Sequence, residues 1–211
     1  MPPVDPPPPS APPTPGDPLP QAAPDPGPTP ASAAVPGQVR LILGIVFLTY
    51  LGQMTLVPVI APFARETGLA EWQVGLTISL AAITVVVTSQ FWGSRAQSWG
   101  RKPVLIAALT LATASMTLFA VLASLGIAGI VRGVTLFVLF LLLRGLFFGA
   151  AIAAVPPTAQ AFVAAVTDSE EARVRGLAGV GAAQSLSLIG GSVFGGLLAG
   201  FGLLTAIWAV P

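Results

Sequence analysis

A single cation, Arg144, interrupts a long apolar stretch that runs from Gly133 to Thr167. If this stretch crosses a bilayer, inserting the arginine costs about 2.5 to 3.5 kcal/mol. A residue that is so costly to insert is expected to have a partner or a task. The alternative is an arginine whose donors are satisfied by nearby carbonyl groups, or one that snorkels to the membrane surface.

Most familiar catalytic chemistry is excluded, because the 211 residues contain no Cys, no His and no Asn. Thiolate and imidazole metal sites, Ser-His-Asp and Cys-His nucleophiles and N-glycosylation sequons are therefore absent. The net charge is +1 and the longest basic run is Arg101-Lys102, which does not predict a nucleic-acid surface. We expect no enzyme, no cofactor and no metal site.

Other polar residues within apolar stretches are few. Tyr50 and Gln53 stand one turn apart on a predicted first helix, and Gln184 lies on a predicted fifth helix. We regard these three as candidates for lining a substrate path; the alternative is that they only form hydrogen bonds between helices. Acidic residues lie only outside the predicted spans, so a proton-coupled cycle would need a carboxylate from elsewhere.

Charged residues delimit the helices that must position these side chains. The chain is 54% hydrophobic and 8% charged, against about 25% charged in soluble domains. A bilayer core of about 30 Å takes about 20 helical residues and tolerates almost no charge. The pattern predicts an all-α membrane protein whose transmembrane bundle covers residues 40–211, with five full helices and the start of a sixth. The spans are expected at 41–64, 72–93, 103–125, 134–160 and 176–200, with the partial sixth at 203–211.

Residues 1–39 are rich in proline and contain little that could bury apolar surface, which predicts a disordered tail. No apolar stretch precedes Arg40, so we expect no signal peptide. With the tail inside, six Lys and Arg residues lie in cytoplasmic segments and two in outer loops. The positive-inside rule then predicts a multi-pass protein of the cell membrane with a cytoplasmic amino terminus.

The segment between the second and third predicted spans reads GSRAQSWGRKP, from Gly93 to Pro103. It resembles the signature loop of the Major Facilitator Superfamily, G-x-x-x-D-x-x-G-R-[KR]. The resemblance implies a gating loop that latches two halves of a transporter together. Gln97 replaces the family's Asp and cannot form its ion pair. An ordinary positive-inside loop is the alternative. The matching positions are Gly93, Gln97, Gly100, Arg101 and Lys102.

Two further segments carry the same resemblance. The stretch from Arg144 to Gly149 is similar to a fourth-helix motif, R-x-x-x-G, with one extra residue; it implies that Arg144 couples protons or substrate. The fifth predicted span resembles the antiporter motif G-P-x-x-G-G, with serine replacing proline. The positions that match the antiporter motif are Gly191, Ser192, Gly195 and Gly196. Packing of helices through small residues is the plainer interpretation of this span.

The resemblance covers residues 40–211 and implies the amino-terminal half of a Major Facilitator Superfamily fold, in which the substrate site lies between two halves. We expect a secondary transporter of small molecules, an exporter of drug-like compounds coupled to protons, present as an incomplete fragment. The partners implied are the lipid bilayer, a small-molecule substrate and protons. The alternative is a non-transporting membrane bundle or truncated relic whose Pro-rich tail binds a partner.

Overall fold

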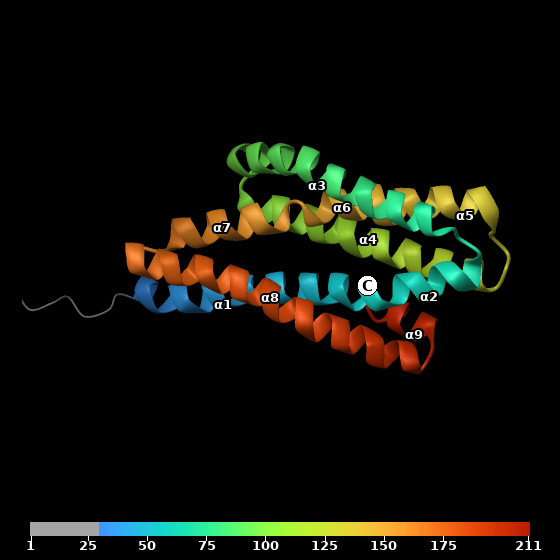
Figure 1. Ribbon diagram of the computed structural model, residues 1–211. Coiled ribbons are helices and arrows are strands. Elements are labelled where there is room, and N and C mark those ends of the chain that lie inside the picture. Colours follow the sequence, from blue (N-terminus) through green and yellow to red (C-terminus); the bar gives the residue numbers. More distant parts are fainter. Residues whose placement is uncertain (1–29) are drawn as a thin grey trace, which may run out of the picture.

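The computed structural model describes residues 30–211, with side chains from Gly37 onward, and every element in this part of the chain is helical. Figure 1 shows the helices running lengthwise in one bundle, with α1 and α2 beside α8 and with α4 in the middle. The bounds are α1 Pro30–Thr55, α2 Val57–Thr67, α3 Glu71–Ser98, α4 Arg101–Ile127, α5 Gly133–Phe140, the π-helical segment η1 Leu141–Phe147, α6 Phe148–Ile152, α7 Val155–Val166, α8 Glu170–Gly200 and α9 Leu203–Trp208.

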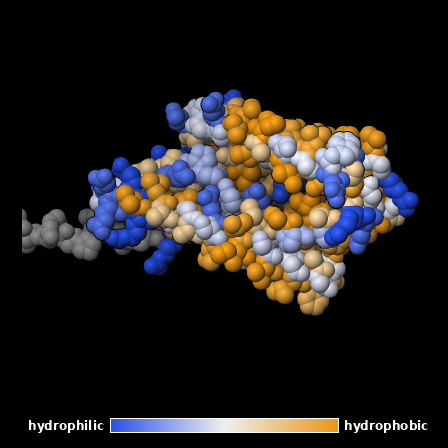
Figure 2. All heavy atoms as spheres, in the orientation of Figure 1, coloured by the Kyte–Doolittle hydropathy of each residue, from blue (hydrophilic) through white to orange (hydrophobic). Residues whose placement is uncertain are grey.

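Five helical units of this bundle are long and apolar enough to cross a membrane, which confirms the predicted fold class. They cover 37–67, 71–98, 101–127, 133–166 and 170–200. Figure 2 shows hydrophilic residues at both ends of the bundle and a broad hydrophobic band between them. This distribution is the one that a bilayer imposes, because apolar side chains face lipid and charges stay in the headgroup layers.

The first span is longer than expected and is divided in two. Residues 1–29 of the predicted disordered tail lie outside the described residues, but α1 begins at Pro30, before the predicted end of the tail at 39. The division falls at Leu56, between α1 and α2, with Pro58 in the first turn of α2. Proline has no amide hydrogen, so it cannot donate to the preceding turn and interrupts the helical ladder.

The fourth span is the most irregular. The expected continuous helix at 134–160 consists of α5, η1, α6 and α7, and it extends to Val166. The break at Ala153 and Ala154 precedes Pro156 and Pro157, which occupy the first turn of α7. Proline is tolerated there because the first amides of a helix have no partner within it.

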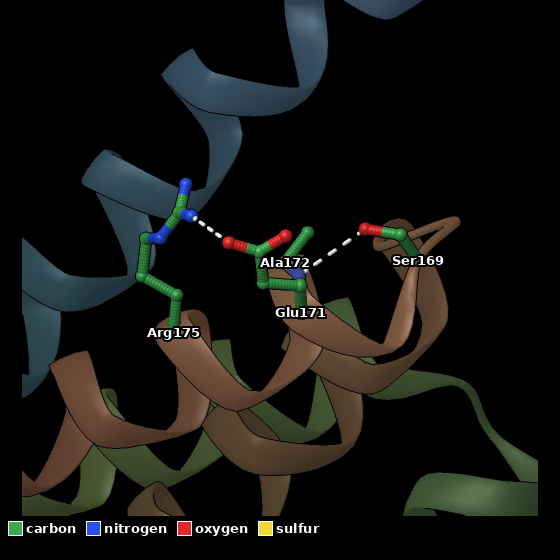
Figure 3. Close-up of polar contacts among 4 residues, drawn as sticks. All are labelled: Ser169, Glu171, Ala172 and Arg175. Atoms are coloured by element: carbon green, nitrogen blue, oxygen red, sulfur yellow. Dashed lines mark hydrogen bonds and ion pairs between the residues drawn. The ribbon is translucent and has the colours of Figure 1, made fainter.

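The second and fifth spans also exceed their expected limits. The second continues to Ser98 rather than 93, and α8 begins at Glu170 rather than 176. Ser169 caps α8, since its Oγ accepts a hydrogen bond from the Ala172 amide at 3.2 Å; Arg175 and Glu171 form an ion pair at 2.8 Å one turn on (Figure 3). Charges limit the membrane-embedded part of a helix, but capping determines where the helix starts.

Three aromatic rings form the centre of the main apolar core. Phe63 of α2, Phe119 of α4 and Phe140 of α5 are almost fully buried, with ring centroids 5.6 to 6.0 Å apart. Aromatic pairs at this spacing each contribute about 0.5 to 1.5 kcal/mol beyond area burial. The cluster fixes α2, α4 and α5 to one another, and so positions the first residues of η1, which follows α5 directly.

Candidate functional site

Arg144 and Gln53 line one cavity of about 520 Å³ within the membrane-embedded part of the bundle. Gln53 comes from α1 and Arg144 from η1, while α2, α3, α5 and α6 complete the walls. The Gln53 Oε1 and Arg144 Nε atoms are buried and have no hydrogen-bond partner among the described residues. The lining also includes Thr77, whose hydroxyl donates to the Gln73 carbonyl of its own helix at 2.9 Å. The cavity is therefore apolar with a few polar groups, as ligand sites usually are.

The π-helical segment η1 sets the orientation of Arg144. A π turn shifts the hydrogen-bond register, and such turns occur frequently at functional sites. Ser115 of α4 donates a hydrogen bond to the Leu143 carbonyl in η1 at 2.6 Å, so this irregular backbone is anchored to a neighbouring helix. The Trp92 indole of α3 likewise donates to the Ala150 carbonyl of α6 at 2.7 Å.

Two glycines that follow Arg144 in the chain pack against α3. A Cβ added at Gly145 would lie 3.2 Å from the Thr77 carbonyl oxygen, and one at Gly149 would lie 3.1 Å from that of Ala81. Their spacing is the small-xxx-small pattern that lets helix backbones approach in membranes. From the sequence, Gly149 was identified only as a motif position and Gly145 was not identified. The four-residue spacing of the two glycines is the sequence feature that could have predicted this close contact.

The guanidinium of Arg144 is not paired with a carboxylate in the described chain. Its central carbon lies 4.7 Å from the centroid of the Phe148 ring, which is a cation–π geometry. The only ion pair among residues 37–211 is the exposed Arg175–Glu171 pair. Arg144 thus presents hydrogen-bond donors to a cavity whose walls include the aromatic rings of Phe140 and Phe148.

Tyr50 and Gln184, the other two substrate-path candidates, belong to a different contact. Their side chains interact across the interface between α1 and α8. Neither residue lines the Arg144 cavity. The structure therefore divides the four predicted polar residues into two pairs, Gln53 with Arg144 and Tyr50 with Gln184.

All five predicted gating-loop positions line a second cavity of about 1180 Å³ at the end of the bundle where α3 meets α4. Gly93 does not sit at a helix end as expected, because α3 continues past it to Ser98. The turn depends on Gly100, whose φ of 90° favours glycine. Gln97 is exposed in the last turn of α3. Arg95 lies between aromatic rings, 5.1 Å from the Phe91 centroid and 4.5 Å from that of Trp99.

The antiporter-like segment packs against α1. An added Cβ at Gly191 would lie 2.7 Å from the Leu51 carbonyl oxygen, and one at Gly195 would collide with the carbonyl of Thr55. Ser192 instead donates to the Leu188 carbonyl of its own helix at 2.8 Å, and Gly196 faces open space. Ser187, one turn earlier, is fully buried and lies 2.8 Å from the Phe47 carbonyl oxygen of α1.

Comparison with known proteins agrees with this architecture. A family model described as the Major Facilitator Superfamily matches residues 42–211. Multidrug resistance protein 2 of Bacillus subtilis is 29% identical over 163 residues, which are 77% of this chain and 37% of that relative. The chain therefore spans well under half the length of the curated relative it matches. With five membrane-length helices and a match over nearly the whole described bundle, the chain belongs to the Major Facilitator Superfamily of membrane transporters.

Proposed function

We propose that this chain forms the amino-terminal half of a secondary active exporter of drug-like small molecules. The family match and the multidrug resistance relative support this proposal. Alternating access requires a second helical half that moves against the first, with the substrate near the midplane between them. The 211-residue chain alone is then expected to give no saturable transport.

The observation that carries the proposal is the cavity that Arg144 and Gln53 share. A buried polar atom without a partner costs about 1 to 3 kcal/mol, and more when the group is charged. Two residues that line one cavity, Gln53 and Arg144, each carry such an atom. A substrate that forms hydrogen bonds with these two residues would offset this cost only in the substrate-bound state. Binding is then selective for molecules that carry complementary donors and acceptors.

The groups in the cavity define the substrate chemistry that we propose. Arg144 supplies donors and a positive charge, Gln53 supplies an acceptor and a donor, and Phe140 and Phe148 supply aromatic walls. These features fit neutral or anionic aromatic compounds that carry carbonyl, carboxylate or sulfonyl oxygens. They fit cationic compounds poorly, because no carboxylate lines the cavity.

Coupling to protons is the part of the proposal that this half does not supply by itself. Every Asp and Glu in the described chain lies outside the predicted spans, at one end of the bundle or the other. A carboxylate that binds and releases protons would therefore belong to the second half. In this arrangement the positive charge of Arg144 interacts with that carboxylate. Protonation of the carboxylate removes its negative charge and so changes the affinity of the Arg144 site for substrate.

We propose that the remaining family motifs belong to segments that move during transport. The loop from Gly93 to Lys102 would gate the cytoplasmic side, without the ion pair that an Asp at Gln97 would form. The glycines Gly191 and Gly195 would let α8 slide closely along α1. We place the amino terminus in the cytoplasm and the protein in the cell membrane, because the bundle end that contains Arg101 and Lys102 is the more basic one.

Transport is tested with the full reading frame that contains residues 1–211, expressed in cells that lack their own exporters. Accumulation of matched anionic, neutral and cationic aromatic dyes is then measured. We expect lower accumulation of the anionic and neutral dyes, and restoration of accumulation by Arg144→Leu. Equal accumulation of all dyes with and without the protein would refute export.

A further inference from the structure

The π turn in η1 absorbs one extra residue of the fourth span. The Phe148 amide donates to the Leu143 carbonyl five residues back, whereas an α-helix connects residues four apart. Because an α-helix turns by about 100° per residue, one extra residue shifts everything after η1 by about 100° relative to a continuous α-helix. The stretch from Arg144 to Gly149, which is one residue longer than the motif that it resembles, contains part of this turn.

This shift aligns the cavity-lining residues on the two sides of the turn. Phe140 precedes η1 and Ile152 ends α6, and both line the Arg144 cavity. Twelve positions separate them, which would leave them about 120° apart around a continuous α-helix but leaves them about 20° apart once the π turn absorbs one residue. The extra residue therefore allows α5 and α6 to face the same cavity.

Arg144 is the middle residue of η1, so the direction of its side chain depends on where the extra residue lies. If the extra residue preceded it, in α5, Arg144 would lie within about 20° of Leu136 around the helix. Leu136 is fully buried and lies against Gly126 of α4, so the guanidinium would point into the apolar core. If the extra residue followed it, Arg144 would lie about 40° from Phe140, on the cavity side.

Ser115 of α4 contacts the carbonyl at which the hydrogen-bond spacing changes. Its hydroxyl donates to the Leu143 carbonyl at 2.6 Å, and the residue is 2% exposed. The same carbonyl accepts the five-residue bond from the Phe148 amide. Moving the π turn along the helix would return this carbonyl to a four-residue bond and draw it away from Ser115. A buried hydroxyl that loses its partner is costly, so this contact favours the present position of the turn.

We infer that Ser115 is a positioning residue for the Arg144 site. It holds the extra residue of the fourth span at Leu143, and so keeps the guanidinium directed into the cavity rather than towards α4. Ser115 does not itself line the cavity, so it acts through the backbone of η1. The direction of Arg144 is a property of the bundle, whereas its use in substrate binding rests on the proposed function.

Thiol labelling of Arg144→Cys measures the direction of this side chain, because the chain has no cysteine of its own. The full reading frame that contains residues 1–211 is purified in detergent, with any cysteine beyond residue 211 replaced by serine, and treated with a small water-soluble methanethiosulfonate. Adding Ser115→Ala should slow the reaction about fivefold, the factor that corresponds to the loss of one typical hydrogen bond. Adding Ser115→Thr instead keeps the hydroxyl and should preserve the rate.

Two single-residue deletions set the direction without relying on Ser115. Deletion of Leu142 and deletion of Leu146 both remove the extra residue, and both leave a continuous α-helix of the same length and composition. Deleting Leu146 keeps the residue at 144 on the cavity side, whereas deleting Leu142 turns it towards α4. We expect fast labelling after the first deletion, with or without Ser115→Ala, and slow labelling after the second. Both deletion variants should unfold at temperatures close to that of the undeleted protein.

Ser187→Ala is the matched control. Ser187 is also buried, and its hydroxyl lies 2.8 Å from the carbonyl of Phe47 on another helix, away from η1. This change should leave the labelling rate unaltered. Equal rates with and without Ser115→Ala, the same slowing in Ser187→Ala, or equal rates in the two deletions would overturn the inference. Unfolding of both deletion variants would overturn it as well, because η1 would then hold no extra residue. The expected labelling in a protein that exports no dye would refute the proposed function and leave the inference standing.

Discussion

Arg144 of η1 and Gln53 of α1 face the same cavity, although 91 positions separate them in the sequence. Each brings one buried polar atom that no other described residue satisfies. Neither atom forms a hydrogen bond that holds the helices together, so burying the two atoms destabilises the fold without a compensating contact. The pair is the part of this half that we expect to contact substrate.

Arg144→Leu should therefore lower export while making the bundle more stable. Export is expected to fall at least tenfold, a loss of about 1.4 kcal/mol of binding energy. The free energy of unfolding should rise, by at most the insertion cost of about 2.5 to 3.5 kcal/mol. Dye accumulation in cells and thermal unfolding in detergent measure the two effects. Arg144→Lys keeps the charge but not the planar fork of donors, and should retain part of the activity. Export that is unchanged in Arg144→Leu would remove the residue from the substrate site.

The contact of Gly195 with the Thr55 carbonyl predicts a sharp difference between neighbouring glycines. Gly195→Ala places a methyl group against backbone that cannot rotate away, so α8 must move from α1. Such overpacking costs about 1 to 3 kcal/mol. Gly196→Ala is the matched control, since it faces open space, and it should cost nothing. Thermal unfolding in detergent compares the two, and similar midpoints for both variants would contradict the close approach.

The turn between α3 and α4 provides a second matched pair. Gly100 has a φ of 90° and a ψ of 160°, a region that is essentially restricted to glycine. Gly100→Ala should destabilise the chain by about 1 to 3 kcal/mol. Gly93→Ala lies inside α3 with no atom near the added methyl, and should be neutral or slightly stabilising. A protein that tolerated both changes equally would not have this turn.

The orientation of the chain in the membrane can be measured by thiol labelling, because the chain has no cysteine and single thiols can be introduced. Ala70→Cys and Ser98→Cys place exposed thiols at opposite ends of α3. With the amino terminus in the cytoplasm, a membrane-impermeant maleimide should label Ala70→Cys in intact cells and Ser98→Cys only after permeabilisation. The reverse pattern would invert the proposed topology.

Hydropathy alone predicted the five helical segments of the described chain that are long and apolar enough to cross a membrane. The free energy gained by removing apolar side chains from water is larger than the effects of single residues on local structure. Uncharged segments of sufficient length therefore predicted all five spans and the helical fold class. Their ends were less predictable. Arg95 limits the embedded part of the second span, but α3 continues past it in the headgroup layer, and Ser169 rather than the next apolar residue starts α8.

Only the tertiary structure decided which polar residues meet. The sequence grouped Tyr50 with Gln53 because they are about one turn apart, but three residues leave their side chains about 60° apart around α1. Tyr50 therefore interacts with Gln184, whereas Gln53 lines the Arg144 cavity. The π turn at Leu141–Phe147 has the same origin, since it depends on Ser115 of another helix and on glycines that admit α3. Burial in lipid is a property of each segment by itself. The rotation and register of a helix depend on neighbours that are distant in the chain.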